Sequence, residues 1–542
     1  MMKKAIKKLL AALLAVAMLC AMAIPAFAYD TEEVRAHHSF EAFQIFQGDV
    51  SDDNTKISNV KWGKNITNST DFLEKLTADP TISGEFNNPT TAQDVLAVIS
   101  KWHDSDDNSI AFARFVCHYL YSGAVDPGTS IPSSGDVVEI PIDGAGYYLI
   151  VDTTYFKPGD SYHAYNSFLL KVNKGKFNLP IKPKFVKPTV EKKVYDNDIN
   201  DISSAGGWGS SADHAINEKF KFQLIAKLPA SKDNGRAYDY YDKYTVCFND
   251  TLSAGITFDN LDTVKIANVD GDNSKEITNY KFDDTDLHEA GHPTSFKLSI
   301  DDVKTCAAAA GLNLNDGATI TVTYTAHLNE NATVNTEGGS NTTDNKNSVF
   351  LQYSNNPRID TSLDQTPTSE VRVYTYQLNN TKYHDDDTPG NELAGAGFRL
   401  YSDEACTPEQ EVKLYKKDNF YYPIKDATDK AQDAVEMFSD EHGQFNVKGL
   451  DAGTYYLKET KTPDDYSPCP DKKIVISATH TEYNVNLSGE SNLNNKIINI
   501  KAGGITLPST GGIGTTLFYV VGGGLMVAAI VLLVTKKRME NK

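Results

Sequence analysis

The sequence predicts a mainly β protein built from several β-sandwich domains in tandem. Short segments rich in Val, Tyr, Thr and Phe alternate apolar and polar residues, as half-buried strands do. Gly, Asn, Asp and Pro separate many of these segments at roughly 8- to 12-residue intervals, a spacing typical of sandwiches. The chain has 542 residues, and at about 150 residues per domain this length gives three or four domains.

The first 28 residues are typical of a secretory signal peptide. A lysine-rich start precedes an apolar stretch that ends in Ala26-Phe27-Ala28, a small-residue cleavage site. The mature chain is therefore expected to begin at Tyr29, with an uncleaved N-terminal membrane anchor as the alternative. Five cysteines remain, and this odd number argues against a disulfide framework. The pairs Cys247–Cys306 and Cys406–Cys469 could still form within single domains.

Composition and two short motifs bear on partners and metals. A formal net charge of -20 argues against nucleic acid, whose phosphates need basic patches. The stretch from His288 to His292 reads HEAGH and fits the zinc-protease pattern, which requires a helix. Gly291 and Pro293 disfavour a helix there, and a strand-like segment follows, so we expect an exposed loop. The stretch DGDNSKE lacks the glycine and distal glutamate of a calcium loop and is expected to be an acidic turn. No cofactor or metal is predicted; a secreted zinc hydrolase that uses both histidines is kept as a rival hypothesis.

The C-terminal segment combines three features in order. Residues 513–535 are uncharged and long enough to cross a bilayer as a helix, and a basic tail follows. Just before them stands a pentapeptide that resembles the LPxTG cell-wall sorting signal of Gram-positive surface proteins. The resemblance implies that a sortase cleaves between the fourth and fifth residues and passes the new carbonyl to an amine through a thioester. The five residues are Leu507, Pro508, Ser509, Thr510 and Gly511.

The part between the two targeting segments divides into three expected domains. Residues 29–184 mix strands with two helix-like stretches, TAQDVLAVISKW and SIAFARFVCHYL. A proline-rich connector leads to an all-β stretch at 185–370. A second connector leads to a second all-β stretch at 371–504, and residues 505–542 form the sorting segment.

Several stretches together resemble one family. LAGAGFRLY and GLDAGTYYLKETKTPDDY resemble the B-type collagen-adhesin-like domain of Gram-positive pilins, with Glu459 in the acidic position of the E-box. FNDTLSAGITFD and NSVFLQYSNNP resemble the middle domain of these proteins, and FEAFQIFQGDV and GYYLIVD the first domain. The chain thus resembles a sortase-assembled backbone, or major, pilin made of tandem Ig-like β-sandwiches of the collagen-adhesin A and B types.

The resemblance implies that sandwich domains close internal Lys–Asn isopeptide bonds without an enzyme. Burial lowers the pKa of a lysine and raises that of a carboxylic acid, so both become neutral in an apolar core. The amine then attacks the asparagine amide, the acid polarises the carbonyl group, and ammonia leaves. Strand pairing holds the reactants in contact and supplies much of the rate.

For the third domain, the resemblance and position near the domain ends assign Lys382 as nucleophile, Glu459 as acid and Asn499 as amide. Asn495 is the alternative amide. The first domain has no lysine in its opening strand, HSFEAFQIF, so no such bond is expected there.

For the middle domain, the two-residue period of PTVEKKV puts Lys192 on the face of its apolar neighbours. Asp250 occupies the family's acid position. Asn355 shares a face with two apolar residues of LQYSNNP and is the expected amide, with Asn356 as the alternative.

Polymerisation requires an acceptor amine on the next subunit. The stretch LPIKPK stands where the family has its pilin motif, and Lys184 is the candidate acceptor. Because the family's tyrosine is replaced by Lys182 and its upstream tryptophan is absent, Lys182 or Lys187 could serve instead.

These features predict a structural major subunit of a covalent, cell-wall-anchored pilus and not an enzyme. Expected partners are pilus-class and housekeeping sortases, identical subunits and peptidoglycan, with minor pilins and host surface ligands as further candidates. The alternative is a monomeric wall-anchored adhesin that lacks a reactive linker lysine.

Overall fold

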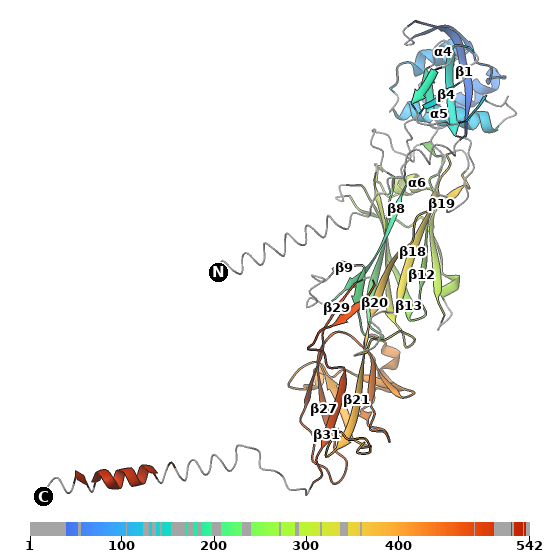
Figure 1. The fold of residues 1–542 in the computed structure, drawn as a ribbon. Helices are drawn as coiled ribbons and strands as arrows, with labels where there is room; N and C mark the ends of the chain where they lie inside the picture. The colour runs from blue at the N-terminus through green and yellow to red at the C-terminus, as the bar shows by residue number, and fades with distance from the viewer. Residues whose placement is uncertain are drawn as a thin grey trace.

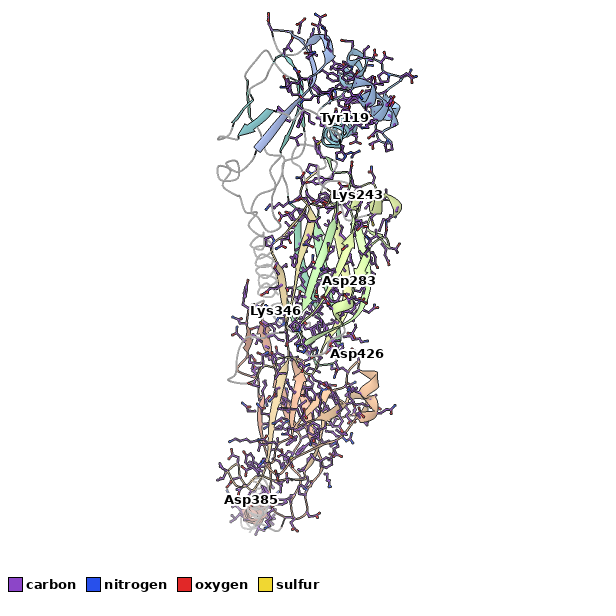
Figure 2. The ribbon with its side chains drawn as sticks, turned by 90° about the vertical axis from the view of Figure 1, so that its right-hand side faces the viewer. Tyr119, Lys243, Asp283, Lys346, Asp385 and Asp426 are labelled. Atoms are coloured by element: carbon purple, nitrogen blue, oxygen red, sulfur yellow. The ribbon has the colours of Figure 1, made fainter. Side chains whose placement is uncertain are left out.

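The computed structural model arranges the chain as three β-rich units along one long axis (Figure 1). A view turned by 90° shows the same linear order, with Lys243 and Asp385 at opposite ends of the two later units (Figure 2). The structure describes residues 39–52, 56–103, 106–122, 129–132, 137–140, 144–152, 168–171, 177–180, 187–197, 207–229, 240–269, 273–287, 292–314, 317–336, 345–357, 360–481, 483–502, 522, 525–534 and 536–537.

The first unit packs helices against an antiparallel sheet of strand order β2-β1-β5-β6, with β3 also paired to β1. Phe72 and Phe112 from the helices and Ile45 and Leu149 from the sheet are fully buried in one core. The elements are β1 (Ser39–Val50), β2 (Ile57–Trp62), α3 (Ser69–Ala78), η1 (Ser83–Glu85), α4 (Ala92–Ile99), α5 (Asp107–Ser122), β3 (Thr129–Pro132), β4 (Val137–Ile140), β5 (Gly146–Asp152), β6 (Phe168–Lys171) and β7 (Phe177–Pro180).

The middle unit is a sandwich of two sheets. One sheet has the order β10-β20-β18-β12-β16-β15 with β19 beside β18, and the other has the order β14-β13-β17-β11-β8-β9. The elements are β8 (Thr189–Asp196), β9 (Gly207–Gly209), β10 (Ser211–Asp213), β11 (Lys219–Lys227), β12 (Val246–Leu252), β13 (Ile256–Ala267), β14 (Lys275–Glu276), β15 (Lys281–Asp283), η3 (Thr285–Leu287), β16 (Thr294–Ile300), α6 (Val303–Ala309), β17 (Thr319–Leu328), β18 (Lys346–Ser354), β19 (Leu363–Gln365) and β20 (Ser369–Tyr374).

The third unit pairs a sheet of order β23-β24-β26-β21-β31 with one of order β25-β22-β27-β28, and a hairpin β29-β30 stands apart. The elements are β21 (Tyr376–His384), β22 (Gly397–Tyr401), η4 (Pro408–Gln410), β23 (Leu414–Lys417), β24 (Phe420–Pro423), η5 (Thr428–Asp433), β25 (Met437–Phe438), β26 (Asn446–Leu450), β27 (Gly453–Lys461), β28 (Lys472–Ile476), β29 (Ala478–His480), β30 (Val485–Leu487) and β31 (Asn494–Asn499).

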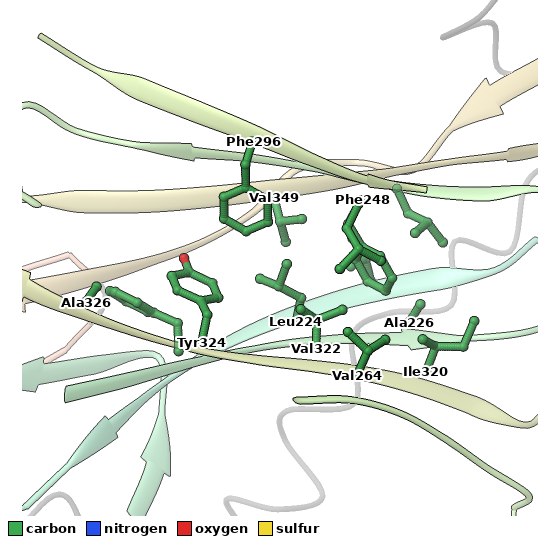
Figure 3. Packing of buried hydrophobic residues seen from close by; sticks show 14 of the residues in the cluster. Leu224, Ala226, Phe248, Val264, Phe296, Ile320, Val322, Tyr324, Ala326 and Val349 are labelled. Atoms are coloured by element: carbon green, nitrogen blue, oxygen red, sulfur yellow. The ribbon is translucent and has the colours of Figure 1, made fainter. Parts of the chain in front are cut away.

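Alternation along the strands builds the cores. In β17 every second residue from Ile320 to Leu328 is buried, and the strand faces its partners across the sandwich (Figure 3). The middle core continues into the third unit, because Tyr415 and Tyr422 belong to the same buried cluster. Only Thr375 separates β20 from β21, so the two sandwiches meet with no linker.

The mainly β class and the tandem sandwiches predicted from sequence are confirmed, as are the two helices α4 and α5. Helices α3 and α6 were not anticipated. The expected domain limit after residue 370 falls inside β20, which pairs with the middle sheet. The five cysteines after residue 28 are free thiols, so neither suggested disulfide is present.

Candidate functional site

The third unit buries a lysine on its first strand. The alternation of β21 turns Leu378, Asn380 and Lys382 inward, and all three are fully buried. The last strand, β31, lies beside β21 in a parallel pairing that sets Lys382 opposite Ile497. Since inward residues of paired strands share one face of the sheet, the lysine amine lies among the buried side chains of β31.

An amide and a carboxylic acid converge on this amine. The Nζ of Lys382 donates hydrogen bonds to Oδ1 of Asn499 (2.6 Å) and to the backbone oxygen of Ile497 (3.3 Å). The Nδ2 of Asn499 in turn donates to Oε1 of Glu459 on β27 (2.7 Å). The second oxygen of Glu459 accepts a hydrogen bond from the backbone N–H of Cys469 (2.8 Å), which orients the carboxyl group.

The electrostatics of this cluster favour a neutral amine. Burial lowers the pKa of Lys382 despite the opposing influence of Cys469 and Glu459. Burial, reinforced by Glu459, raises the pKa of the Cys469 thiol to about 12, so that neighbour stays neutral. An uncharged amine within hydrogen-bonding distance of an amide is a nucleophile held close to its target.

The alternative amide of the third unit, Asn495, lies two repeats of the strand alternation before Asn499 on the same face of β31. It pairs with Asn380 in the parallel ladder, four residues before Asn499 on β31, and its side chain is buried. Because four strand residues span about 13 Å, Asn495 and Asn499 cannot both reach the amine of Lys382. The structure brings Lys382, Glu459 and Asn499 together and leaves Asn495 apart.

The middle unit holds a second buried lysine, between its two sheets. Lys192 lies on β8 and is 2% exposed, and Asp250 lies on β12 of the facing sheet and is fully buried. Nζ of Lys192 contacts Oδ2 of Asp250 directly. Burial lowers the pKa of Lys192 to about 8, against the influence of Asp250, and burial also raises the pKa of Asp250. Both shifts move the pair toward the neutral amine and the neutral acid.

A tyrosine and an asparagine complete this cluster. The hydroxyl of Tyr324 on β17 accepts a hydrogen bond from Nζ of Lys192 (3.1 Å) and donates one to Oδ1 of Asp250 (3.1 Å). The Nδ2 of Asn347 on β18 donates to the same hydroxyl. Figure 3 shows Tyr324 rising from its strand toward the facing sheet that carries Val349. Asn347 is fully buried two residues before Val349.

The structure places Asn347, and not the expected Asn355, in the cluster around Lys192. Asn355 follows the end of β18; its Oδ1 accepts from Ser362 (2.7 Å) and its backbone N–H donates to the oxygen of Ser362 (3.3 Å). It is eight residues from Asn347, about 26 Å of extended chain, so it cannot share the place of Asn347 beside Lys192. The alternative, Asn356, is buried one residue further on.

Sequence reasoning missed Asn347 and Tyr324 although the information was present. Both continue the inward alternation of their strands, Asn347 with Val349 and Leu351, and Tyr324 with Val322. A polar residue that continues a buried apolar face is unusual enough to mark a site. The two-residue period of a strand cannot distinguish Asn347 from Asn355, because residues an even number of positions apart lie on the same face of the sheet.

The residues expected to join one subunit to the next lie mostly outside the described part of the chain. Lys182, Lys184 and the pentapeptide 507–511 are not described. Lys187 is described, and burial lowers its pKa against the influence of Asp364. Residues 525–534 are helical with exposed apolar side chains, but none of the described helices is long and apolar enough to cross a membrane.

Side chains that could hold a metal ion gather at two places in the described ranges. Residues 288–291 of the HEAGH stretch are not described, and the strand expected after it is β16. Of the stretch DGDNSKE, residues 270–272 are likewise not described, and its last two residues form β14. The two groups of ligand-type side chains lie where the middle and third units meet. They are Asp196, Asp213 and His480, and His214, Glu218 and Asp451.

The first of these groups is a buried polar network that joins two units. Nε2 of His480, on β29 of the third unit, lies 3.2 Å from Oδ2 of Asp196 and 3.8 Å from Oδ1 of Asp213, both of the middle unit. Ser211 bonds Nδ1 of His480 (2.8 Å), and the hydroxyl of Tyr376 donates to Oδ2 of Asp213 (2.8 Å). All members are nearly inaccessible to water, and their contacts link the middle unit to the third unit.

Comparisons with known proteins match two parts of the chain. Residues 379–491 match the family model of the SpaA prealbumin-like fold domain, and residues 499–541 match that of the LPXTG cell wall anchor motif. No protein among the curated ones matches the chain.

Several solved structures are similar in fold at low identity. The 35 kDa C-terminal fragment of the major pilin of Streptococcus agalactiae is 22% identical; the match covers 58% of this chain and 99% of that one, with a TM-score of 0.38. A backbone pilin of Streptococcus pyogenes is 16% identical, over 87% and 97% of the two chains, with a TM-score of 0.44. The full-length major pilin SpaD of Corynebacterium diphtheriae is 16% identical, over 86% and 90%, with a TM-score of 0.40.

The anchor motif supports a cell-wall-anchored surface location for the chain. The third unit thus matches the SpaA prealbumin-like fold family, and the segment after it carries the LPXTG cell wall anchor motif of Gram-positive surface proteins.

Proposed function

We propose that the chain is the repeating structural subunit of a covalent pilus on a Gram-positive cell surface, stiffened by two internal Lys–Asn isopeptide bonds. The observation that carries the proposal is the contact of the buried Lys382 and Asn499 with the partly buried Glu459, in a unit that directly precedes the anchor motif. The triad supplies an amine, an amide and an acid in contact, which are the groups this reaction needs.

In the third unit the reaction joins neighbouring strands. Nζ of Lys382 attacks the amide carbon of Asn499 and a new amide forms as the bond from this carbon to Nδ2 breaks. Glu459, which already contacts Nδ2, transfers the proton that Nζ loses to the leaving nitrogen, and ammonia departs. The product links β21 to β31, the first and last strands of the unit.

In the middle unit we assign the bond to Lys192 and Asn347, with Asp250 as the acid. The bond joins β8 of one sheet to β18 of the other, so it closes the sandwich across its core. Each bond releases one ammonia, so the mature chain is expected to weigh about 34 Da less than its sequence predicts.

Between subunits, we propose that sortase joins Thr510 of one chain to a linker lysine of the next, with Lys184 as the first candidate and Lys182 and Lys187 as alternatives. A pilus-class sortase would build the polymer, and a housekeeping sortase would transfer it to peptidoglycan. The partial burial and lowered pKa of Lys187 argue for testing that residue beside the other two.

The experiment is a gel of wall extracts boiled in sodium dodecyl sulfate, from cells that make the sortases and the full chain. A ladder of high-mass bands that disappears in Lys184→Ala supports the proposal and the site. If the ladder persists in Lys184→Ala but is lost in Lys182→Ala or Lys187→Ala, the acceptor lysine is the one whose substitution removes the ladder. Single-subunit bands alone, with active sortase, would leave a monomeric wall-anchored adhesin.

A further inference from the structure

The hydroxyl of Tyr324 contacts all three reacting groups of the middle unit. It accepts from Nζ of Lys192 (3.1 Å) and from Nδ2 of Asn347, and it donates to Oδ1 of Asp250 (3.1 Å). A phenolic hydroxyl offers one donor and two acceptor lone pairs, so these three bonds use its full capacity. A tyrosine that served only to pack the core would not need its hydroxyl oxygen among the reacting groups.

The two crosslinking clusters differ at the leaving nitrogen. In the third unit, Nδ2 of Asn499 donates directly to the acid, Glu459. In the middle unit, Nδ2 of Asn347 donates to the hydroxyl of Tyr324, and this hydroxyl in turn donates to the acid, Asp250. Oδ1 of Asn347 has no hydrogen-bond partner within the described ranges, so Tyr324 alone fixes the orientation of this amide.

The ring of Tyr324 is held rigidly and keeps its proton. Phe222, Phe258 and Phe296 contact it with ring centroids 5.2–5.4 Å away. Burial, together with the nearby Asp250, raises the pKa of Tyr324 well above its ordinary value. A hydroxyl that stays protonated and cannot turn away is suited to pass a proton between two fixed neighbours.

We propose that Tyr324 is a catalytic residue that carries a proton from the attacking amine of Lys192 to the leaving nitrogen of Asn347. The inference rests on the proposed crosslink of the middle unit. It assigns Tyr324 the contact with the leaving nitrogen that Glu459 makes in the third unit, and it leaves Asp250 to take up the ammonium proton of Lys192.

The proton transfers balance. Lys192 first loses one proton to Asp250, which passes it on to the solvent, and a neutral amine remains. Nζ then bonds to the amide carbon of Asn347. As this carbon becomes tetrahedral, the lone pair of Nδ2 is no longer shared with the carbonyl group and can accept a proton. Tyr324 gives its proton to Nδ2 and takes one from Nζ, the bond from carbon to Nδ2 breaks, and ammonia leaves. The tyrosine ends unchanged, and no oxidant or co-reactant is needed.

The test is Tyr324→Phe in the full chain, which removes one oxygen and keeps the ring that packs against the phenylalanines. The chain is made by cell-free synthesis, quenched in denaturant at intervals and digested, and the branched peptides of the two units are counted by mass spectrometry. General acid–base contributions predict a middle bond slower on the order of 100-fold, with the bond between Lys382 and Asn499 forming at its usual rate.

Two controls separate chemistry from folding. Tyr353→Phe removes another buried hydroxyl of the same sandwich, which donates to Asp364 (3.1 Å), and should leave the middle bond unchanged. Site-specific 3-fluorotyrosine at position 324 keeps size and shape but makes the phenol more acidic. Because expulsion of the amide nitrogen needs a proton, we expect the middle bond to form at least about threefold faster with this residue.

The outcomes are distinct. No branched peptide from Lys192 and Asn347 in the unmodified chain would remove the proposed middle crosslink itself, and the role of Tyr324 with it. A middle bond at the usual rate in Tyr324→Phe would overturn only the tyrosine's role. If Tyr324→Phe fails to fold, as protease digestion of the middle unit would reveal, an unchanged rate with 3-fluorotyrosine overturns the inference and an increased rate supports it.

Discussion

The amine nitrogen of Lys382 lies 2.6 Å from the amide oxygen of Asn499, on the adjacent parallel strands that begin and end the third unit. Because the strands are parallel, tension along the chain pulls the start of β21 and the end of β31 in opposite directions. The hydrogen bonds between these strands are then loaded in shear. A covalent bond between Lys382 and Asn499 would carry this load in their place, which suits a subunit joined end to end.

Replacement of the acid of the third unit should prevent its bond. In Glu459→Gln we expect the mature chain to be about 17 Da heavier than the unmodified chain after correction for the substitution, because one ammonia is retained. By the loop-closure argument used for disulfides, loss of a link across more than 100 residues costs about 4–5 kcal/mol of unfolding free energy. Intact-mass and melting measurements check both, with the exposed Glu441→Gln as matched control. An unshifted mass in Glu459→Gln would contradict the assignment.

The amide of the middle unit can be identified by two substitutions on one strand face. Asn347→Ala should retain one ammonia and appear about 17 Da heavy after correction, whereas Asn355→Ala should lose both ammonia molecules as the unmodified chain does. The reason is reach, since only Asn347 contacts the cluster around Lys192. If instead Asn355→Ala were about 17 Da heavy and Asn347→Ala were not, Asn355 would be the amide that bonds to Lys192.

Formation of the middle bond should depend on pH through Lys192. Burial lowers the pKa of this lysine to about 8, and only the unprotonated amine attacks. Below pH 8 the ammonium form dominates, so the initial rate should rise roughly tenfold per pH unit up to about pH 8 and rise less steeply above it. Time courses of branched peptide between pH 6 and 8 measure this slope. A rate that stays flat across that range would show that deprotonation of Lys192 does not limit the reaction.

The junction of the middle and third units should depend on His480. Substitution by Ala leaves the carboxylates of Asp196 and Asp213 buried without the imidazole beside them. Removal of one partner of a buried ionic network costs roughly 3–5 kcal/mol. We therefore expect a lower unfolding midpoint by calorimetry and faster proteolysis at the junction. His442→Ala, which alters an exposed pair with Glu441, is the control and should melt as the unmodified chain does.

Much of the molecule could be predicted without coordinates. The two-residue period identified the strands, and it turned Lys192 inward on β8, where the structure buries it. Helices α4 and α5 followed from their three-to-four spacing of apolar residues. Helix α3 was missed, since its ten residues bury only Phe72 and Leu76 and so show a weak apolar pattern. Local periodicity is a property of a short segment, and the sequence displays it directly.

By itself, then, the sequence determined the order of units, the anchor segment, the faces of the strands and the inward lysines. The tertiary structure decided which groups meet: Asn347 in place of Asn355, the hydroxyl of Tyr324 between amine and amide, and His480 against Asp196. The period of a strand fixes the side of the sheet to which a residue belongs but not the point along the facing strand that it meets. That point depends on register and sheet packing between segments more than 100 residues apart.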